Sequence, residues 1–267
     1  MTGIRPPAVA GSFYPDEPAI LEAVVADFLA EACGMPGRQS PKAIIAPHAG
    51  YIYSGPVAAQ AYAALAPAAG DITRVVLIGP AHFVWVSGIA APGVEAFESP
   101  LGRVPLDRPA IAGIADLPQV VITDTPHGDE HSLEVQLPFL QTVLGDFALV
   151  PLAVGNAEPA EVAQVLERLW GGAETLIVVS SDLSHYHTYE AAKRRDAETA
   201  AAIESLDGGR LGPEDACGCL PICGLLATAA RRGLSVERLD LRSSGDTAGP
   251  KDRVVGYGAW AFHESTG

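Results

Sequence analysis

The 267-residue sequence predicts an α/β protein: a single three-layer α/β/α domain built on a central mixed, mainly parallel sheet. Apolar runs of strand length alternate with helical segments along the whole chain, a pattern typical of a sheet with helices on both faces. Hydrophobic residues make up 48% of the chain, which is ample for a buried sheet. No linker-like change of composition interrupts the alternation, so we expect one domain over residues 1–267.

The N-terminal segment is expected to pack on the domain, because Phe13 and Tyr14 in residues 3–16 require burial. Asp16 is expected to cap a first helix over residues 17–33, whose apolar residues recur at helical spacing. Further helices are expected over residues 56–67, 158–172, 189–206 and 221–232. A short helix is expected to end at residue 114, and another helix is expected to start at residue 132. Strands are expected over residues 42–46, 74–78, 87–91, 119–123, 147–155, 175–182, 235–245 and 253–262, with a hairpin or irregular loop over 97–107.

Two of these segments carry more specific expectations. The helix from residue 132 has leucines on one stripe, and Pro138 should kink it or mark a late start. The last strand, residues 253–262, alternates in a way that suits a half-covered edge strand.

The charge balance excludes some functions. The chain has 17 basic and 32 acidic residues, a net charge of −15, so it lacks the basic surface needed to bind nucleic acid or an anionic membrane. No apolar run approaches the ~20 residues that span a bilayer, and the N-terminus lacks the apolar core of a signal peptide. Four cysteines in a chain of this length form no disulfide framework, so we expect a cytoplasmic protein.

Three buried strands end in residues that can do chemistry. His48 follows residues 42–46, His82 follows 74–78, and Asp182 and His185 follow 175–180. Ligands of open α/β sheets bind at the carboxyl ends of strands, so we expect these side chains in one composite site. Neutral imidazole is the commonest metal ligand in proteins, and His48 and His82 could share an ion.

The string HGDEH, residues 127–131, matches the H-x-x-E-H pattern of inverted zinc peptidases, which would use His127, Glu130 and His131. Pro126 and Gly128 favour a loop or helix start over a helix interior. We therefore expect His131 and Glu134 to line a pocket or to form a hydrogen-bonded capping cluster.

The remaining candidates are a histidine, an acid and three cysteines. His185 could donate or accept a proton, with Asp182 orienting it, binding metal or substrate, or capping a helix. One thiolate joined to two histidines makes a three-ligand metal site with an open position. Cys217 is best placed for this role, Cys219 is an alternative, and Cys223 is expected to pack in the core.

Seven ordered motifs cover almost the whole chain: RPPAVAGSFYP, PHAGYIYSGPVAAQAY, GPAH, HGDEHSLEVQLPFL, SSDLSHY, CGCLPI and SGDTAGPKDRVVGYGAWAF. With these motifs the sequence resembles the Memo family, whose prokaryotic members are often called AmmeMemoRadiSam system protein B. That family is similar in fold to the class III extradiol dioxygenases, which hold non-haem Fe(II) with two histidines and a glutamate. The resemblance implies His48, His82 and Cys217 as metal ligands, His185 as the catalytic base, and Asp182 and His131 as pocket residues.

The resemblance implies a mononuclear Fe(II) enzyme, a dioxygenase-like oxidoreductase acting on a small phenolic or other oxidisable substrate. A thiolate in place of the glutamate would suit copper or zinc equally well. The first alternative is a non-catalytic accessory protein that binds metal or a peptide and works with a radical-SAM and an AMMECR1-like partner. The second alternative is zinc hydrolysis through HGDEH.

Overall fold

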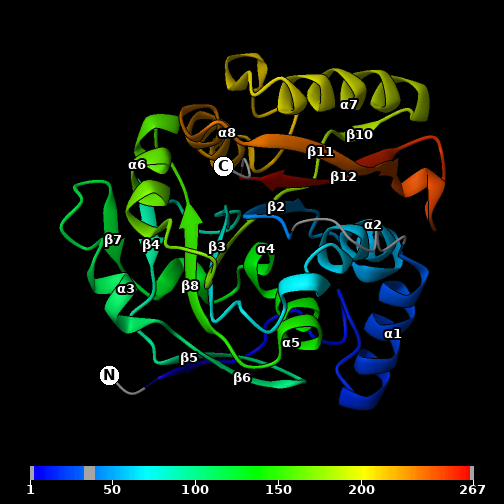
Figure 1. Cartoon of the computed structure of the whole chain (residues 1–267). Helices are drawn as coiled ribbons and strands as arrows, with labels where there is room; N and C mark the ends of the chain where they lie inside the picture. Colours follow the sequence, from blue (N-terminus) through cyan, green and yellow to red (C-terminus); the bar gives the residue numbers. More distant parts are fainter. Residues whose placement is uncertain (1–2, 33–39, 265–267) are drawn as a thin grey trace.

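The computed structural model describes residues 3–32 and 40–264, and one large mixed sheet organises them (Figure 1). The four central strands, in spatial order β2, β9, β3 and β8, run parallel to their neighbours. Antiparallel strands flank them: β12 beside β2, and β4 beside β8. Strand bounds across the sheet are β10 (His185–His187), β12 (Val254–His263), β2 (Ala43–Ala46), β9 (Thr175–Ser180), β3 (Arg74–Pro80), β8 (Ala148–Val154), β4 (Ile89–Ala91) and β7 (Val120–Ile122), with β11 (Ser235–Ser243) paired to β12.

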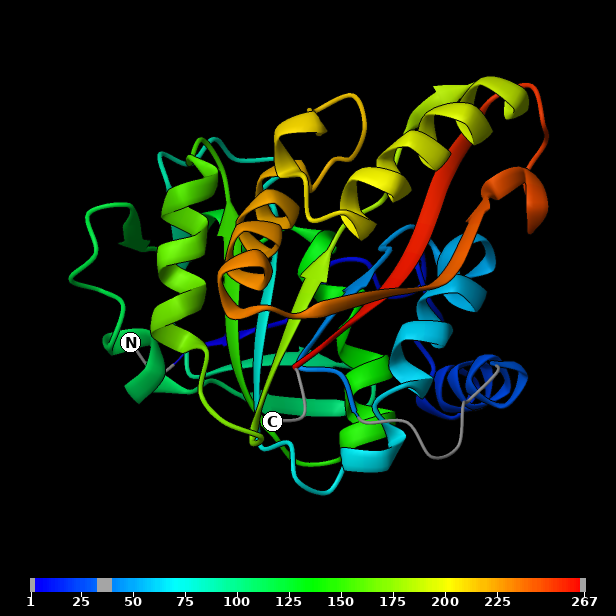
Figure 2. The same cartoon turned by 45° about the horizontal axis from the view of Figure 1, so that its top comes forward.

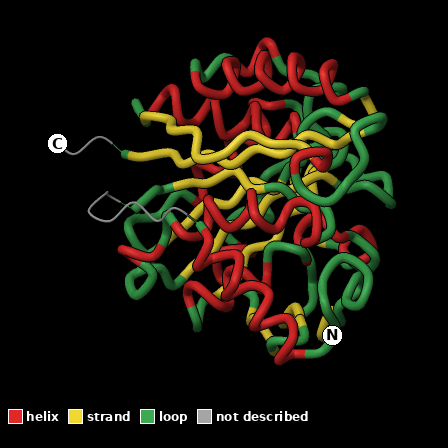
Figure 3. Tube along the Cα trace, turned by 90° about the vertical axis from the view of Figure 1, so that its right-hand side faces the viewer, coloured by secondary structure: helices red, strands yellow, loops and turns green. Residues whose placement is uncertain are grey.

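Helices cover both faces of the sheet, as Figures 2 and 3 show. On one face α8 packs on β3 and β9 and against α6, while α7 packs on β11 and β12. On the other face α2 packs on β2 and β12, α4 contacts β3 and β8, and α1 and α5 pack outside them. The helix bounds are α1 (Pro18–Glu31), α2 (Tyr51–Ala63), α3 (Arg108–Ala112), α4 (His131–Glu134), α5 (Leu137–Leu144), α6 (Pro159–Leu169), α7 (Tyr189–Glu204) and α8 (Cys219–Arg232).

This arrangement confirms the predicted three-layer α/β/α fold with a mixed, mainly parallel sheet. Every residue of β2 and β9 is buried, because a strand covered on both faces has no polar side to present to solvent. The prediction of a single domain over the whole chain stays a prediction.

The N-terminal arm packs on the domain as predicted, with Tyr14 buried and Phe13 half-buried. Its first strand, β1 (Ile4–Arg5), forms a small separate sheet with the hairpin β5 (Ala96–Ser99) and β6 (Gly102–Pro105). The hairpin expected over residues 97–107 is therefore present.

Three local predictions change. Glu17, not Asp16, caps α1, accepting a hydrogen bond from the Ile20 backbone N–H at 3.0 Å. The predicted end of that helix at residue 33 lies outside the described residues. The helix expected from residue 132 is split into α4 and α5. Pro138 marks the predicted late start, because it lies in the first turn of α5, where a missing N–H costs nothing. Strand β12 is not an edge strand, because it pairs with β10, β11 and β2 and is buried along most of its length.

No helix among the described residues is both long enough and apolar enough to cross a membrane.

Candidate metal centre

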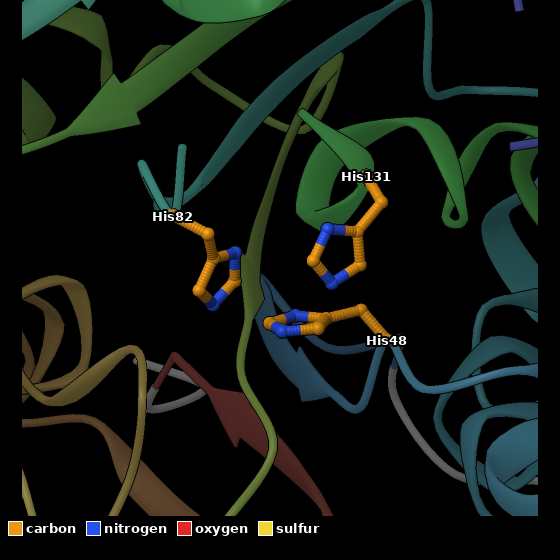
Figure 4. A group of neighbouring side chains, drawn as sticks. All are labelled: His48, His82 and His131. Carbon is orange, nitrogen blue, oxygen red and sulfur yellow. The ribbon is translucent and has the colours of Figure 1, made fainter. Parts of the chain in front are cut away.

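The site lies at the ends of three neighbouring parallel strands. Because β2, β9 and β3 lie side by side, their carboxyl ends form one edge of the sheet. His48 lies two residues beyond the end of β2, and His82 lies two beyond the end of β3. His131 reaches the same point from the start of α4. The potential ligand atoms of these three histidines all lie within 4.8 Å of one another (Figure 4).

His48 is held in one tautomer by a buried hydrogen-bond chain. Ser180 Oγ, at the end of β9, donates its single proton to the Ser132 carbonyl at 2.6 Å and accepts from Gln136 Nε2 at 2.7 Å. His48 Nδ1 lies 2.9 Å from the same Oγ, so Nδ1 must be the donor in this pair. The lone pair of His48 is therefore on Nε2. Burial lowers the pKa of His48 to about 3, so the ring is neutral and able to bind a metal.

His82 is held in the matching tautomer by Glu130. One carboxylate oxygen accepts from the His82 backbone N–H at 2.5 Å, and the other lies 2.9 Å from His82 Nδ1. Burial alone would raise the pKa of Glu130, but hydrogen bonds from His82 and Ser132 outweigh it and lower the pKa to about 2. An ionised carboxylate only accepts, so His82 Nδ1 is the donor in this pair, and Nε2 is the ring nitrogen left to bind a metal. Carboxylate–histidine pairs of this kind orient metal ligands in proteins.

His131 packs face to face with His82 and edge to face with His48, with ring centroids 4.7 and 5.4 Å away. Its Nδ1 lies 3.3 Å from Glu130 and has no hydrogen-bond partner among the described residues. Burial lowers the pKa of His131 to about 4, which leaves this ring neutral as well. The sequence predicted His131 as a pocket residue, and its geometry also makes it a potential ligand.

Cys217 contacts His48 but lies outside the cluster of the three histidines. Its Sγ lies 3.4 Å from His48 Nε2 and 3.6 Å from the Asp182 carbonyl oxygen. Burial raises the pKa of Cys217 to about 12, so the metal-free protein carries a thiol and a bound cation would have to displace its proton. His131 therefore completes the cluster with His48 and His82, whereas the predicted ligand Cys217 contacts His48 and is not part of this cluster.

Asp182 shapes the turn that carries His48. Its Oδ1 accepts from the backbone N–H groups of His48 and Ala49 at 2.7 and 3.3 Å. Burial raises its pKa, while these hydrogen bonds and the charge of His185 act in the opposite sense. His185 begins β10, the short strand that follows Asp182 and pairs with β12. The assignment of His185, Asp182 and His131 as catalytic residues stays a prediction.

Two residues of the HGDEH region lie elsewhere. His127 Nε2 lies 3.2 Å from the Ala90 carbonyl oxygen, and the His127 ring packs against Phe97, outside the histidine group. Glu134 does not line the pocket but forms a buried ion pair with Arg5 and accepts from Tyr14 Oη at 2.5 Å. It anchors the N-terminal arm because α4 turns it away from the sheet edge.

Sequence reasoning missed Ser180 and Gln136, which fix the His48 tautomer. A signal was present for Ser180, since it ends a buried apolar run like the one that precedes His48. Nothing local marked Gln136, because its partners come from β9 and from the turn after β2. Cys219 and Cys223 are buried near the start of α8, and Cys223 Sγ lies 3.2 Å from the Gly208 carbonyl oxygen.

Fold and site together define an α/β protein with a cluster of three histidines at the carboxyl edge of its sheet that could bind a metal ion. The model of the Memo-like protein family matches residues 5–261. The chain belongs to this family. A MEMO1 family protein of Thermotoga neapolitana is 37% identical, with 95% of this chain and 98% of the relative covered. Another, of Saccharolobus solfataricus, is 36% identical, with 97% and 99% covered.

A solved structure supports the fold. The uncharacterized protein JW3007 of Escherichia coli K12 superposes with a TM-score of 0.53 at 16% identity, covering 84% of this chain and all of the other. Likeness at this identity concerns the fold alone.

Proposed function

We propose that this protein is a mononuclear metal enzyme, a non-haem iron, dioxygenase-like oxidoreductase acting on a small phenolic or other oxidisable substrate. The observation that carries the proposal is the cluster of His48, His82 and His131, whose potential ligand atoms lie within 4.8 Å of one another. Ser180 and Glu130 hold His48 and His82 through Nδ1, and Cys217 contacts His48 Nε2. Such sites commonly have two imidazoles and a third protein ligand, with open positions for other molecules.

The donor set fits a first-row transition metal. Neutral imidazoles suit iron, copper and zinc, and the thiolate of Cys217 would favour the softer ions among them. We assign Fe(II) as the working metal, with copper or zinc as alternatives that elemental analysis decides. A bound Fe(II) would supply redox chemistry with O₂ and would acidify a phenolic hydroxyl group that reaches it.

The chain's own residues would do the rest. Glu130 and Ser180 hold the two imidazoles before the metal arrives, so binding requires little rearrangement. His185 would accept the phenolic proton, and Asp182 would hold the turn that carries His48. Burial of His48 keeps water from its ring, and the partly exposed His82 side leaves a route for the substrate.

The decisive experiment separates metal binding from turnover. His48→Ala should lose bound metal, whereas His185→Ala should keep it and lose oxygen uptake with a panel of catechols under Fe(II). His187→Ala, in the same short strand β10, is the matched control and should keep both. Loss of metal in the His185 variant would make this residue a ligand and refute its assigned role.

The third ligand needs its own comparison. Cys217→Ser and His131→Gln variants should be loaded with Co(II), whose absorption responds to sulfur ligation. The proposal expects a thiolate-to-metal charge-transfer band that Cys217→Ser abolishes and His131→Gln retains. The opposite pattern would assign the third position to His131.

A second candidate is an accessory role without turnover, as a metal- or peptide-binding protein that works with a radical-SAM and an AMMECR1-like partner. It is favoured by the exposed aromatic side chains of Phe83 and Tyr186, which follow His82 and His185 directly and are 63% and 64% exposed. Metal-loaded protein that consumes no oxygen with any catechol, and binds purified partners in a manner that Phe83→Ala and Tyr186→Ala weaken, would support this role over the enzymatic one.

A further inference from the structure

An apolar cavity of about 470 Å³ lies beside the candidate metal centre, between the residues after β3 and the segment that leads into α8. Pro80 and Ala81, which directly precede His82, line the cavity together with Cys217. The Sγ of Cys217 also lies 3.4 Å from His48 Nε2. The cavity and the metal centre therefore share one wall.

The lining of this cavity is uncharged. Among the described residues, it has no Asp, Glu, Lys, Arg or His side chain, although the whole chain has 49 basic and acidic residues (17 + 32). Its walls are aliphatic side chains such as Val84, Val86, Leu211 and Leu220, with prolines and cysteine thiols between them. Thiols pack as small apolar groups. The side-chain amide in the lining belongs to Asn156, which is an exposed residue.

We propose that the apolar cavity binds an uncharged hydrocarbon substituent of the substrate, whose phenolic end lies at the metal centre. This inference rests on the proposed function and narrows its substrate class to phenols with an aliphatic or aromatic tail. A cavity of this size is typical of sites for small organic molecules. A carboxylate or ammonium tail would lose its hydration there without gaining a partner.

Trp85 is an intrinsic fluorescent reporter of ligand binding in the cavity. It lines the cavity and is 78% exposed, so a ligand that fills the cavity would cover its ring. The other two tryptophans, Trp170 and Trp260, are 3% and 0% exposed and are not among the lining residues. A change in tryptophan fluorescence on ligand binding therefore reports on Trp85.

The test is a fluorescence titration of metal-free protein with 4-alkylcatechols from ethyl to hexyl, and with 3,4-dihydroxybenzoate as the charged analogue. Each added methylene should tighten binding about fourfold until the cavity is full. The charged analogue should bind at least tenfold more weakly than ethylcatechol. Trp85→Phe should abolish the fluorescence change while calorimetry still detects binding. Equal affinity along the alkyl series, or tighter binding of the benzoate, would overturn the inference.

A filling variant tests the location. Gly209 lines the cavity, and a Cβ there would meet Asp207 Oδ1 at 3.5 Å, an ordinary contact. Gly209→Phe should therefore fold and weaken hexylcatechol binding at least tenfold. Gly70→Phe is the matched control, since a Cβ at Gly70 meets nothing within 4 Å and this residue is outside the cavity. Unchanged hexylcatechol affinity in the Gly209 variant would place the ligand elsewhere.

The binding titrations need neither metal nor turnover. Compared with the oxygen-uptake assay, they therefore separate this inference from the proposed function. Chain-length dependence without oxygen uptake would leave the cavity assignment standing and reject the dioxygenase-like activity. Oxygen uptake with catechols whose affinity does not depend on chain length would support the dioxygenase-like activity and reject the cavity assignment.

Discussion

Glu130 offers the sharpest test of the candidate metal centre, because one carboxylate both fixes the His82 tautomer and holds its backbone. Glu130→Gln keeps the size of the side chain and one acceptor oxygen. That oxygen can still accept from His82 Nδ1, but the new amide nitrogen then faces the His82 backbone N–H, where the carboxylate accepted at 2.5 Å. Two donors meet, so the variant must break one of the two hydrogen bonds.

The broken hydrogen bond should lower both the metal affinity and the free energy of unfolding. Losing a partner that orients a ligand typically costs 10- to 100-fold in metal affinity, or about 1.4–2.7 kcal/mol at 25 °C. Leaving one partly buried N–H without an acceptor costs about 1–3 kcal/mol in the free energy of unfolding. We therefore expect the metal-free variant to fold, with moderately lower stability and a clearly weaker site.

The assay is a chelator competition for Zn(II), repeated anaerobically with Fe(II), together with urea unfolding of the metal-free proteins. Asp107→Asn is the control, because Asp107 also accepts from a backbone N–H, that of Ala110 at 2.9 Å, and pairs with Arg74 at the far end of β3. This control should lose stability and keep its metal affinity. If Glu130→Gln binds metal within threefold of the wild type, Glu130 does not organise the site and the tautomer argument fails for His82.

Three further predictions concern stability. Glu134→Gln leaves the buried Arg5 guanidinium without its countercharge, so the free energy of unfolding should fall by about 3–5 kcal/mol and limited proteolysis should release the N-terminal arm; resistance equal to the wild type would contradict this. His127 has a folded pKa of about 4, below its ordinary value of 6.5, so its contribution is complete above pH 6.5 and is lost as the pH falls toward 4. In metal-free protein His127 should account for a loss of about 2 kcal/mol between pH 7 and pH 5, absent from His127→Gln in paired urea titrations. Gly256→Ala should destabilise by about 1–3 kcal/mol, because its Cβ would lie 2.1 Å from Asp196 Oδ2; an unchanged melting curve would refute that steric argument.

Much of the fold could be predicted from local sequence pattern. Buried strands such as β2 and β9 appear as short continuous apolar runs ended by proline or polar residues, and α6 and α7 have helical periodicity. The edge position predicted for β12 was wrong because alternation describes one strand, whereas pairing with β10, β11 and β2 depends on segments far away in the chain. Periodicity carries no information about which strand lies beside which.

The candidate site divides in the same way. The residue types that follow the strands singled out His48, His82 and Asp182, because ligands bind at the carboxyl ends of parallel strands. The pairing of His82 with Glu130 and of His48 with Ser180 joins residues 48 and 132 positions apart, so no short motif contains either pair. Glu134, three residues after His131, was expected at the pocket and instead anchors the N-terminal arm.

By itself, then, the sequence determined the layered α/β fold, the family and two of the histidines at the sheet edge. It could do so because short apolar runs indicate which strands are buried and where each strand ends. Only the tertiary structure decided that His131 and Cys217 both reach His48, and which ring nitrogens are left free. Those outcomes depend on the strand order β2, β9, β3 and on buried hydrogen bonds, which form only when distant segments meet.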